Sequence, residues 1–205
     1  ICFCESRFLP GKLALFRHRI ALINDTAINW LPNTSHPDLN DAITFSDLHV
    51  YSKDTLIIAT KRGIHYYSFS RQQEYDCPEF PPVEVRWILF DSTLKGYWAG
   101  SYGNGIYFWI PGQRPLEIPA DRNGWLKTPH YLLTDKEGMT WIPTNHGLFE
   151  TTYSSLVEYV LDTTHIPYFY YWSEKDGLGN NEFNSGGHSG ALILKNGMIS
   201  LSHLQ

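Results

Sequence analysis

One short pattern recurs along the chain at a fixed distance, and it constrains the fold more than any other feature. Each copy has an apolar or aromatic strand, a hydroxyl residue, a few polar residues, a glycine, and then Ile or Leu. Three clear copies end in Gly63-Ile64, Gly105-Ile106 and Gly147-Leu148, so that both intervals between glycines are 42 residues. Regular self-similarity of this kind is typical of repeat architectures.

Each copy predicts a tight β-hairpin, because the glycine supplies the positive φ that such turns need. A second strand follows each glycine, and another β-rich run precedes each copy, with turn residues between them. These preceding runs are residues 43–51, 85–90 and 130–134. Weaker copies flank the clear ones: Arg19 takes the glycine position in the first, and Met198 stands opposite Thr140 in the last.

The length of the repeat predicts the fold class. Units of about 42 residues with three or four short strands are typical of β-propeller blades, which are four-stranded antiparallel sheets. Helical repeats of similar length would show a 3.6-residue apolar period, and this chain does not. We therefore expect an all-β chain of about five repeats, with approximate bounds 1–40, 41–83, 84–127, 128–165 and 166–205. The incomplete last repeat favours part of a larger propeller over five blades that close by themselves, and a β-sandwich is the other alternative.

Composition excludes several classes of function. The chain has 16 Lys and Arg against 21 Asp and Glu, without a basic run, which argues against nucleic-acid binding. No apolar stretch approaches the ~20 residues of a membrane-spanning helix. The cysteines Cys2, Cys4 and Cys77 predict neither a disulfide framework nor a zinc site, and their redox state stays open. Because the chain begins at Ile1 without a leader sequence, we expect mature or truncated material.

Residues that could support catalysis are better explained by structure. The nine histidines never form the zinc-hydrolase pattern of two histidines four residues apart with a glutamate. The stretch 186–190 fails the spacing of a serine nucleophile elbow, because Ala191 is the fifth residue counted from Gly187. Asp91 and Asp135 occupy equivalent turns, where aspartate accepts backbone hydrogen bonds. We expect no catalytic residue, metal or cofactor in this region.

Two segments carry a family resemblance. Residues 135–148 read DKEGMTWIPTNHGL, and a weaker version covers residues 97–106. This resembles the repeat Asp-x-x-Gly-x-Leu-Trp-Ile-Gly-Thr-x-x-Gly-Leu of the two-component regulator propellers, which form the periplasmic sensor region of hybrid two-component systems in Bacteroides-type bacteria. The chain is also similar to the last blade of these sensors in four places, namely Tyr171, Asp176-Gly177-Leu178, Asn181-Glu182-Phe183-Asn184 and Asn196-Gly197.

The resemblance implies a function. It implies a larger propeller of the seven-bladed type, outside the cytoplasm, that senses an oligosaccharide and self-associates through the full-length protein. A membrane helix and a histidine kinase would lie outside this chain, so the chain itself would be no enzyme. The chain departs from the family at Ala59 and Pro143, which replace a glycine. Proline cannot donate to a strand ladder, so we expect Pro143 to be locally unpaired or at an edge.

Binding residues are expected on loops that combine planar and polar side chains, because sugar rings stack on aromatic faces while their hydroxyls need polar partners. Loop 120–125 and the segment from 170 to 182 fit best. The predicted ligand-binding residues are Arg122, Trp125, Tyr171, Trp172, Asn180, Asn181 and Glu182.

Other interpretations of these residues stay open. Trp125 and Trp172 could instead pack between blades, and Glu182 could pin its loop. Two other functions also remain: a propeller used only for protein contact or dimerisation, and a carbohydrate-active enzyme that uses Asp176 or Glu182.

Overall fold

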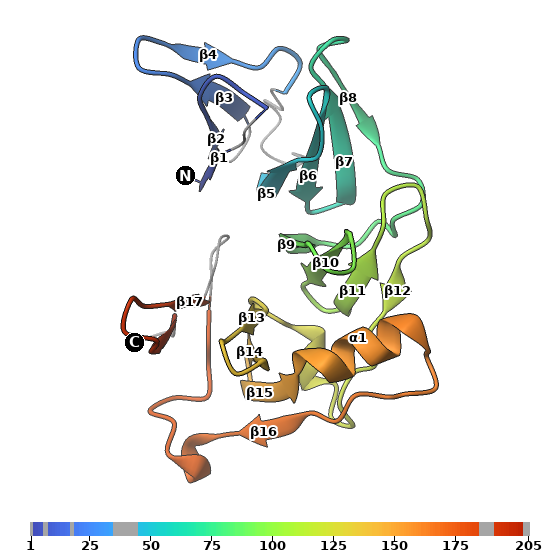
Figure 1. The fold of residues 1–205 in the computed structure, drawn as a ribbon, viewed down its shortest axis with the longest axis vertical. Helices are drawn as coiled ribbons and strands as arrows, with labels where there is room; N and C mark the ends of the chain where they lie inside the picture. Colours follow the sequence, from blue (N-terminus) through green and yellow to red (C-terminus); the bar gives the residue numbers. More distant parts are fainter. Residues whose placement is uncertain (1, 6–7, 17–18, 35–44, 185–190, 203–205) are drawn as a thin grey trace. The chain divides into compact units, whose positions relative to one another are not determined.

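The computed structural model describes residues 2–5, 8–16, 19–34, 45–184 and 191–202 (Figure 1). The chain divides into two compact units, which we call unit 1 (residues 1–88) and unit 2 (residues 89–205). The first residues of the predicted run 43–51, the stretch 186–190, His18 and His203 lie outside the described residues.

Unit 1 holds two four-stranded antiparallel sheets, in which consecutive strands are neighbours. The strands of the first sheet are β1 (Cys2–Glu5), β2 (Lys12–Phe16), β3 (Arg19–Ile23) and β4 (Ile28–Trp30). The strands of the second sheet are β5 (Phe45–Val50), β6 (Thr55–Thr60), β7 (Gly63–Ser68) and β8 (Gln73–Asp76). Phe16 pairs with Arg19 as Thr60 pairs with Gly63, so the structure confirms that Arg19 takes the glycine position.

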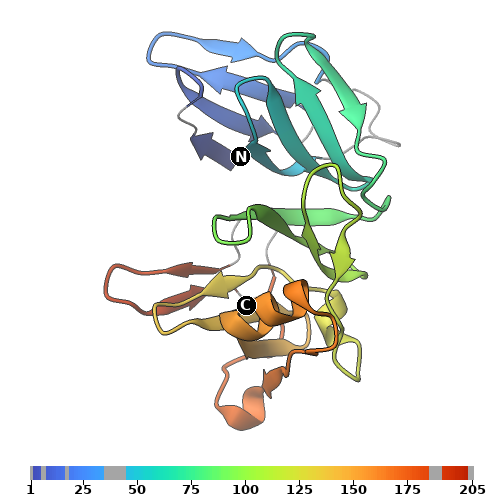
Figure 2. The same cartoon turned by 45° about the vertical axis from the view of Figure 1, so that its right-hand side comes forward.

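Unit 2 holds the third and fourth sheets and a two-stranded hairpin (Figure 2). The third sheet consists of β9 (Val85–Asp91), which starts at the end of unit 1, β10 (Gly96–Ser101), β11 (Gly105–Trp109) and β12 (Leu116–Glu117). The fourth consists of β13 (Leu133–Thr134), β14 (Met139–Thr144), β15 (Gly147–Thr152) and β16 (Tyr170–Trp172). The remaining elements are β17 (Ala191–Ile193), β18 (Ile199–Leu201), the 3-10 turns η1 (Trp125–Lys127) and η2 (Glu174–Asp176), and helix α1 (Tyr153–Leu161).

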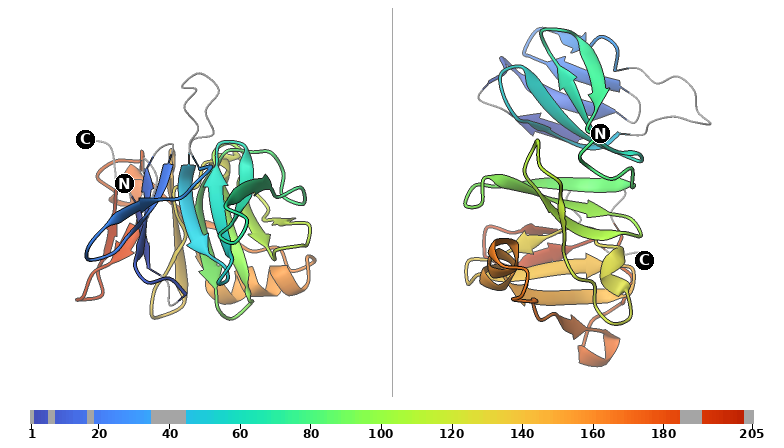
Figure 3. Two further views of the ribbon diagram at one scale, coloured as in Figure 1. Left: turned by 90° about the horizontal axis from the view of Figure 1, so that it is seen from above. Right: turned by 90° about the vertical axis from the view of Figure 1, so that its right-hand side faces the viewer.

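Each four-stranded sheet is a meander of consecutive antiparallel strands (Figure 3). This is the form of a propeller blade, and the predicted all-β fold built from such blades is confirmed. The glycines Gly63, Gly105 and Gly147 start the third strand of their sheets with φ of 110°, 89° and 145°. The positive φ predicted for these turns is therefore confirmed as well.

The hydroxyl residue of the repeat closes the same turn. Thr144 Oγ1 donates to the carbonyl of Gly147 at 2.9 Å and accepts from the backbone N–H of His146 at 3.1 Å. Thr60 Oγ1 makes the equivalent bond to the carbonyl of Gly63 at 3.0 Å. These hydroxyl bonds shape each turn so that the residue before the glycine lies at the tip of the turn.

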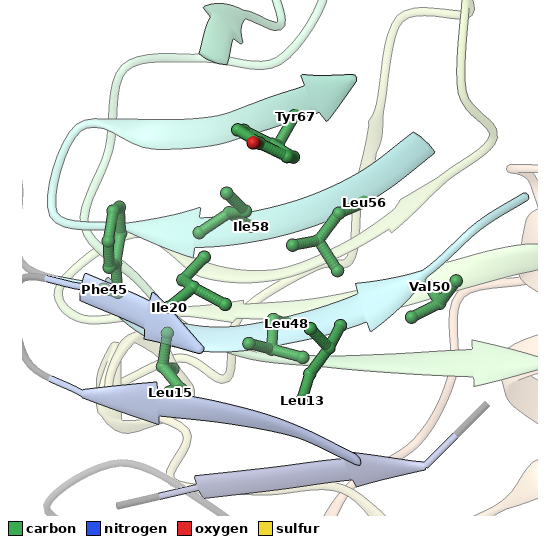
Figure 4. Close-up of a cluster of buried hydrophobic side chains, with 9 residues drawn as sticks. All are labelled: Leu13, Leu15, Ile20, Phe45, Leu48, Val50, Leu56, Ile58 and Tyr67. Atoms are coloured by element: carbon green, nitrogen blue, oxygen red, sulfur yellow. The ribbon is translucent and has the colours of Figure 1, made fainter. Parts of the chain in front are cut away.

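Apolar side chains of the first and second sheets form the core of unit 1 (Figure 4). The nine buried residues are Leu13, Leu15, Ile20, Phe45, Leu48, Val50, Leu56, Ile58 and Tyr67. Leu13, Ile20, Leu56 and Ile58 are fully buried. At about 25 cal/mol for each Å² of apolar surface removed from water, burial of each such side chain stabilises the fold by roughly 1.5–3 kcal/mol.

Two carboxylates in unit 2 hold the repeat tryptophans. Asp91 Oδ2 accepts the indole N–H of Trp98 at 2.8 Å, and Asp135 Oδ2 accepts that of Trp141 at 2.9 Å. Each aspartate also accepts backbone N–H groups of its own turn, Asp91 from Thr93 and Asp135 from Glu137, for example. The predicted turn role of these aspartates is thus observed, and the tryptophan bond explains the Asp and Trp of the repeat.

Helix α1 was not expected from the sequence. Thr152 caps it by accepting the N–H of Ser155 at 3.1 Å, and Leu156 and Tyr159 are its buried residues. Because α1 is inserted between β15 and β16, the fourth sheet ends at Trp172. The predicted repeat boundary at 165/166 therefore falls inside this sheet, between β15 and β16.

Two local predictions can be compared with the backbone. Pro143 lies in the interior strand β14 and not at an edge, but its carbonyl accepts from the N–H of His130, which lies outside β13. Pro143 is also paired with Leu148 of β15, so the prediction that it would be locally unpaired or at an edge was wrong. The amide and carbonyl of a residue face the same side of an antiparallel strand, so the missing donor costs no bond of the β13 ladder. The predicted alignment of Met198 with Thr140 was wrong by one residue: its carbonyl accepts from Leu194, as that of Met139 does from Asp135.

Candidate functional site

Three planar side chains from separate segments of unit 2 lie together. The ring centroid of Trp125 is 4.8 Å from that of Tyr171 and 5.5 Å from that of His146, and the His146 ring is stacked at 24°. Tyr171 Oη also donates to the carbonyl of His146 at 2.6 Å. We call Trp125, His146 and Tyr171 the aromatic cluster. It joins the connector after β12, the turn between β14 and β15, and strand β16.

The loop that carries Trp125 is held by Asp121. One carboxylate oxygen accepts the N–H of Leu126 at 2.7 Å, and the other accepts that of Asn123 at 2.9 Å. Leu126 is buried beneath the loop, whereas Arg122 is exposed at its tip. The sequence Asp-Arg-Asn-Gly-Trp therefore fixes the half-buried indole and leaves the guanidinium in solvent.

Burial and nearby carboxylates keep Tyr171 a neutral hydrogen-bond donor. Partial burial, followed by the negative charges of Asp176 and Asp121, raises the pKa of Tyr171. The phenol consequently retains its proton, and with it the bond to His146, at any physiological pH.

A chain of polar side chains lies next to the aromatic cluster. The Asn145 carbonyl oxygen is 2.6 Å from His130 Nε2, and its amide nitrogen donates to Tyr102 Oη at 3.0 Å. His130 is buried, whereas Tyr102, in the turn between β10 and β11, is exposed. Asn145 therefore connects the turns of the third and fourth sheets on the side where His146 meets Trp125.

The structure brings some of the predicted residues together and separates others. Trp125 and Tyr171 are in contact, and Arg122 lies at the tip of the same loop. Trp172 is not in the aromatic cluster: its indole donates to Glu150 Oε2 at 2.6 Å, and its ring packs edge-on against Tyr170. Trp172 lies apart from Tyr171 because adjacent side chains of a β-strand face opposite sides of the sheet.

The predicted asparagines hold their own loop. Asn181 Oδ1 accepts the N–H of Glu174 at 2.7 Å, and Asn180 Oδ1 accepts that of Glu182 at 2.9 Å. The next residue, Phe183, is buried and donates its N–H to the carbonyl of Thr144 at 3.1 Å. Glu182 is therefore an exposed carboxylate one residue from a bond to the turn that carries His146.

Sequence reasoning missed four residues of this region: Tyr102, His130, Asn145 and His146. One signal was present for His146, because it precedes the turn glycine as Arg62 and Asn104 do in their repeats. A residue at the tip of every hairpin turn lies at the same end of its sheet, which makes this repeat position a natural site for a binding side chain.

The carboxylates considered for catalysis have structural partners. Burial alone would raise the pKa of Asp91, but the N–H of Leu94, the indole of Trp98 and the hydroxyl of Tyr153 hold that pKa below its usual range. Asp176 Oδ2 accepts both the N–H and the hydroxyl of Ser173 at 2.9 Å. Among the described residues, no group of three or more His, Cys, Asp or Glu could hold a metal ion.

Searches against family models and curated proteins return no match for the chain. Solved structures are similar in fold. The extracellular domain of a protein described as a hybrid two-component system of B. thetaiotaomicron gives a TM-score of 0.66 at 17% identity, over 97% of this chain and 25% of that one. That of a described one-component system of the same organism gives 0.66 at 13% identity, over 98% and 28%.

A streptogramin B lyase, which is β-propeller-like, gives a TM-score of 0.59 at 12% identity, over 100% of this chain and 68% of the lyase. The chain thus spans about a quarter of the length of each sensor-system domain. At these identities the similarity establishes the shared propeller fold. The similar structures include extracellular domains of the class of systems that the sequence motifs resemble. No helix in the described ranges is long and apolar enough to cross a membrane.

Proposed function

We propose that this chain is part of the extracytoplasmic sensor region of a two-component signalling protein, and that unit 2 recognises an oligosaccharide at the aromatic cluster. The proposal assigns the chain no catalytic step. Signal transfer, membrane attachment and self-association would depend on further parts of a longer protein. Periplasmic location follows from the same proposal, and it is supported by similarity to extracellular domains of sensor systems.

The observation that carries this proposal is the contact of Trp125 with Tyr171 and His146. The rings of Tyr171 and His146, with centroids 4.8 and 5.5 Å from that of Trp125, hold the indole in place before any ligand binds. A preorganised aromatic face binds a sugar ring with little loss of side-chain freedom. Sugar-binding sites combine such a surface with a few polar groups that fix orientation.

Polar side chains of the required kinds surround the aromatic cluster. Arg122 and Glu182 are exposed, so the guanidinium can donate to a sugar hydroxyl group and the carboxylate can accept from one. The Asn145 amide and the Tyr102 hydroxyl are linked to each other and to buried His130, so their orientation is fixed. The loops that carry these groups are anchored by Asp121 and Asn181, which suits a rigid recognition surface.

Calorimetric titration of the full chain with polysaccharide digests tests the proposal. We expect heat from at least one glycan, and a loss of affinity of about tenfold or more in Trp125→Ala, because removal of an aromatic contact costs about 1.5 kcal/mol. The matched control is Trp30→Ala, since Trp30 is an exposed tryptophan of unit 1. Absence of heat with every glycan would favour the alternative of a module for protein contact only. If the chain converted a glycan into a product, and Asp176→Ala or Glu182→Ala abolished this activity, the enzyme alternative would be favoured.

A further inference from the structure

Unit 1 contains a hollow of about 410 Å³ beside the turn between β6 and β7. Its lining includes Arg62, His65, Asp76, Pro78, Phe80 and Pro82. The volume lies within the range of about 300–1,000 Å³ that is usual for small-molecule sites. No function derived above uses this hollow.

The wall of the hollow is built by the connector that follows β8. Cys77 donates its N–H to the carbonyl of Ile64 at 3.2 Å, and Phe80 donates to the carbonyl of Cys77 at 3.1 Å. A Cβ at Gly63 would lie 2.9 Å from the carbonyl oxygen of Pro81, so only glycine lets the connector approach the turn this closely. With Phe80 almost fully buried, the hollow has a fixed apolar wall before any ligand binds.

His65 supplies a polar group of fixed orientation. Its side chain is buried, and Nδ1 lies 2.8 Å from Glu74 Oε1 and 3.6 Å from Asp76 Oδ1. Glu74, whose side chain is also buried, thus places a carboxylate beside the Nδ1 edge of the ring. Nε2 has no partner among the described residues and can therefore form a hydrogen bond with a ligand hydroxyl.

The charges around the hollow balance. Arg62 and Asp76 are exposed at its edge, and His65 faces Glu74. At this edge one guanidinium stands against one exposed carboxylate, so neither sign of charge dominates there. A neutral ligand with several hydroxyl groups can use the guanidinium as donor, the carboxylate as acceptor and the proline and phenylalanine rings as apolar surface.

The repeat gives a second, independent argument. Arg62 precedes its turn glycine as His146 does, and Asp76 pairs with His65 as Tyr171 pairs with Phe149. Arg62 and His146 therefore share one repeat position, and Asp76 and Tyr171 share another. In unit 1 these two positions line the hollow, and in unit 2 they contribute to the aromatic cluster. The same end of the blade presents side chains for contact in both units.

We propose that the hollow beside Arg62, His65 and Asp76 is a separate binding site for a neutral polyhydroxylated ligand of one or two sugar rings. It requires only residues of unit 1 and does not depend on binding at the aromatic cluster.

Backbone amide NMR spectra of the full chain, recorded during titration with glucose, galactose and N-acetylglucosamine, test the proposal. We expect saturable shifts of the Ile64, His65 and Cys77 amides with at least one of these sugars. Sodium glucuronate is the charged probe, and it should bind more weakly. Asp76→Ala should weaken the binding about fivefold, because one hydrogen bond of about 1 kcal/mol is removed.

Two further variants make the result specific. Pro78→Trp should abolish the shifts by filling the hollow, whereas Glu117→Ala, at the repeat position of Asp76 in the third sheet, should leave them unchanged. The shifts should also persist in Trp125→Ala, which separates this site from the proposed one in unit 2. Three results would each overturn the proposal. The first is shifts that do not saturate with any of the three sugars, and the second is equal binding by the wild type, Asp76→Ala and Pro78→Trp. The third is binding of glucuronate alone.

Discussion

Tyr153 Oη donates to both carboxylate oxygens of Asp91, at 3.0 and 2.9 Å, although the two residues are 62 positions apart in the sequence. Tyr153 is the first residue of α1, and Asp91 ends β9 in the preceding sheet. Since Asp91 also holds the indole of Trp98, one carboxylate fixes both a repeat tryptophan and the inserted helix. The turn aspartate of the repeat therefore also joins neighbouring sheets of unit 2.

We expect Tyr153→Phe to lower the free energy of unfolding by about 2 kcal/mol, because a hydrogen bond to a charged group is lost. Urea unfolding of the full chain measures this change. Tyr170→Phe is the control, since its hydroxyl has no partner among the described residues, and it should change stability by less than about 0.5 kcal/mol. A double-mutant cycle with Asp91→Asn should show coupling; additive effects would contradict the assigned bond.

Gly147→Ala should be much more destabilising than Gly138→Ala. At Gly147, with φ of 145°, a Cβ would lie 2.7 Å from the carbonyl oxygen of Trp172, whereas at Gly138, with φ of 84°, nothing lies within 4 Å. We expect a loss of about 3 kcal/mol or more at Gly147 and about 1 kcal/mol at Gly138, where only the left-handed backbone is penalised. Thermal unfolding compares the two variants, and equal melting temperatures would refute the packing argument.

The stability of the chain should decrease as pH rises from about 4 to about 7, through Asp47. This carboxyl accepts from the N–H groups of Leu48 and Ile88 at 2.8 and 3.0 Å, but burial outweighs these bonds and raises the pKa of Asp47 from 3.8 to about 7. Between these values the folded chain holds a proton that the unfolded chain releases. Stability present at low pH is therefore lost as pH rises through the folded pKa, by up to about 4 kcal/mol.

Urea unfolding at about pH 5 and about pH 8 measures the contribution of Asp47. Asp47→Asn should reduce the difference between the two conditions. In the control variant Asp54→Asn, the difference should remain, because hydrogen bonds from Ser70 and Ser68 lower the pKa of Asp54 and so act at lower pH. A pH dependence that is unchanged in Asp47→Asn would show that Asp47 is ionised in the folded chain at both pH values.

Tyr171 and Trp172 are neighbours in the sequence, yet their variants should differ in effect. Tyr171→Ala should weaken glycan binding about tenfold through loss of an aromatic contact, because its ring touches Trp125. Trp172→Phe should lower stability by about 1–3 kcal/mol through the lost bond to Glu150 and leave glycan affinity unchanged. Calorimetry and urea unfolding of both variants separate the two roles. Equal losses of affinity would place Trp172 at the ligand.

The repeat made the blades predictable, because it depends on local chemistry. The positive φ of a turn glycine and most bonds of a turn aspartate belong to the turn itself, so Gly63, Gly105, Gly147 and Asp135 could be assigned from spacing. Helix α1 was missed although Thr152 is a good cap and Leu156 and Tyr159 are three residues apart. Its sequence lacks the long apolar period that identifies a helix, and its helical conformation is supported by packing and by the bond from Tyr159 to the carbonyl of Glu117.

The candidate site was less predictable, because its contacts join residues far apart in the sequence. Trp125 and Tyr171 were chosen for their chemistry, but their contact with His146 depends on how the third and fourth sheets pack. The position of Trp172 follows from strand alternation, once Tyr171 is placed. The structural role of Asn181 was hidden, since an amide that caps a turn and one that binds a ligand look identical in sequence.

The most direct test of glycan recognition by the aromatic cluster is an NMR titration of the tryptophan indole N–H signals with the glycan that gives heat in calorimetry. We predict that the Trp125 signal shifts saturably, with the affinity found by calorimetry. The signals of Trp98 and Trp141, which donate to Asp91 and Asp135, should stay in place. A stationary Trp125 signal under saturating glycan would contradict the account, because the ligand would then bind elsewhere.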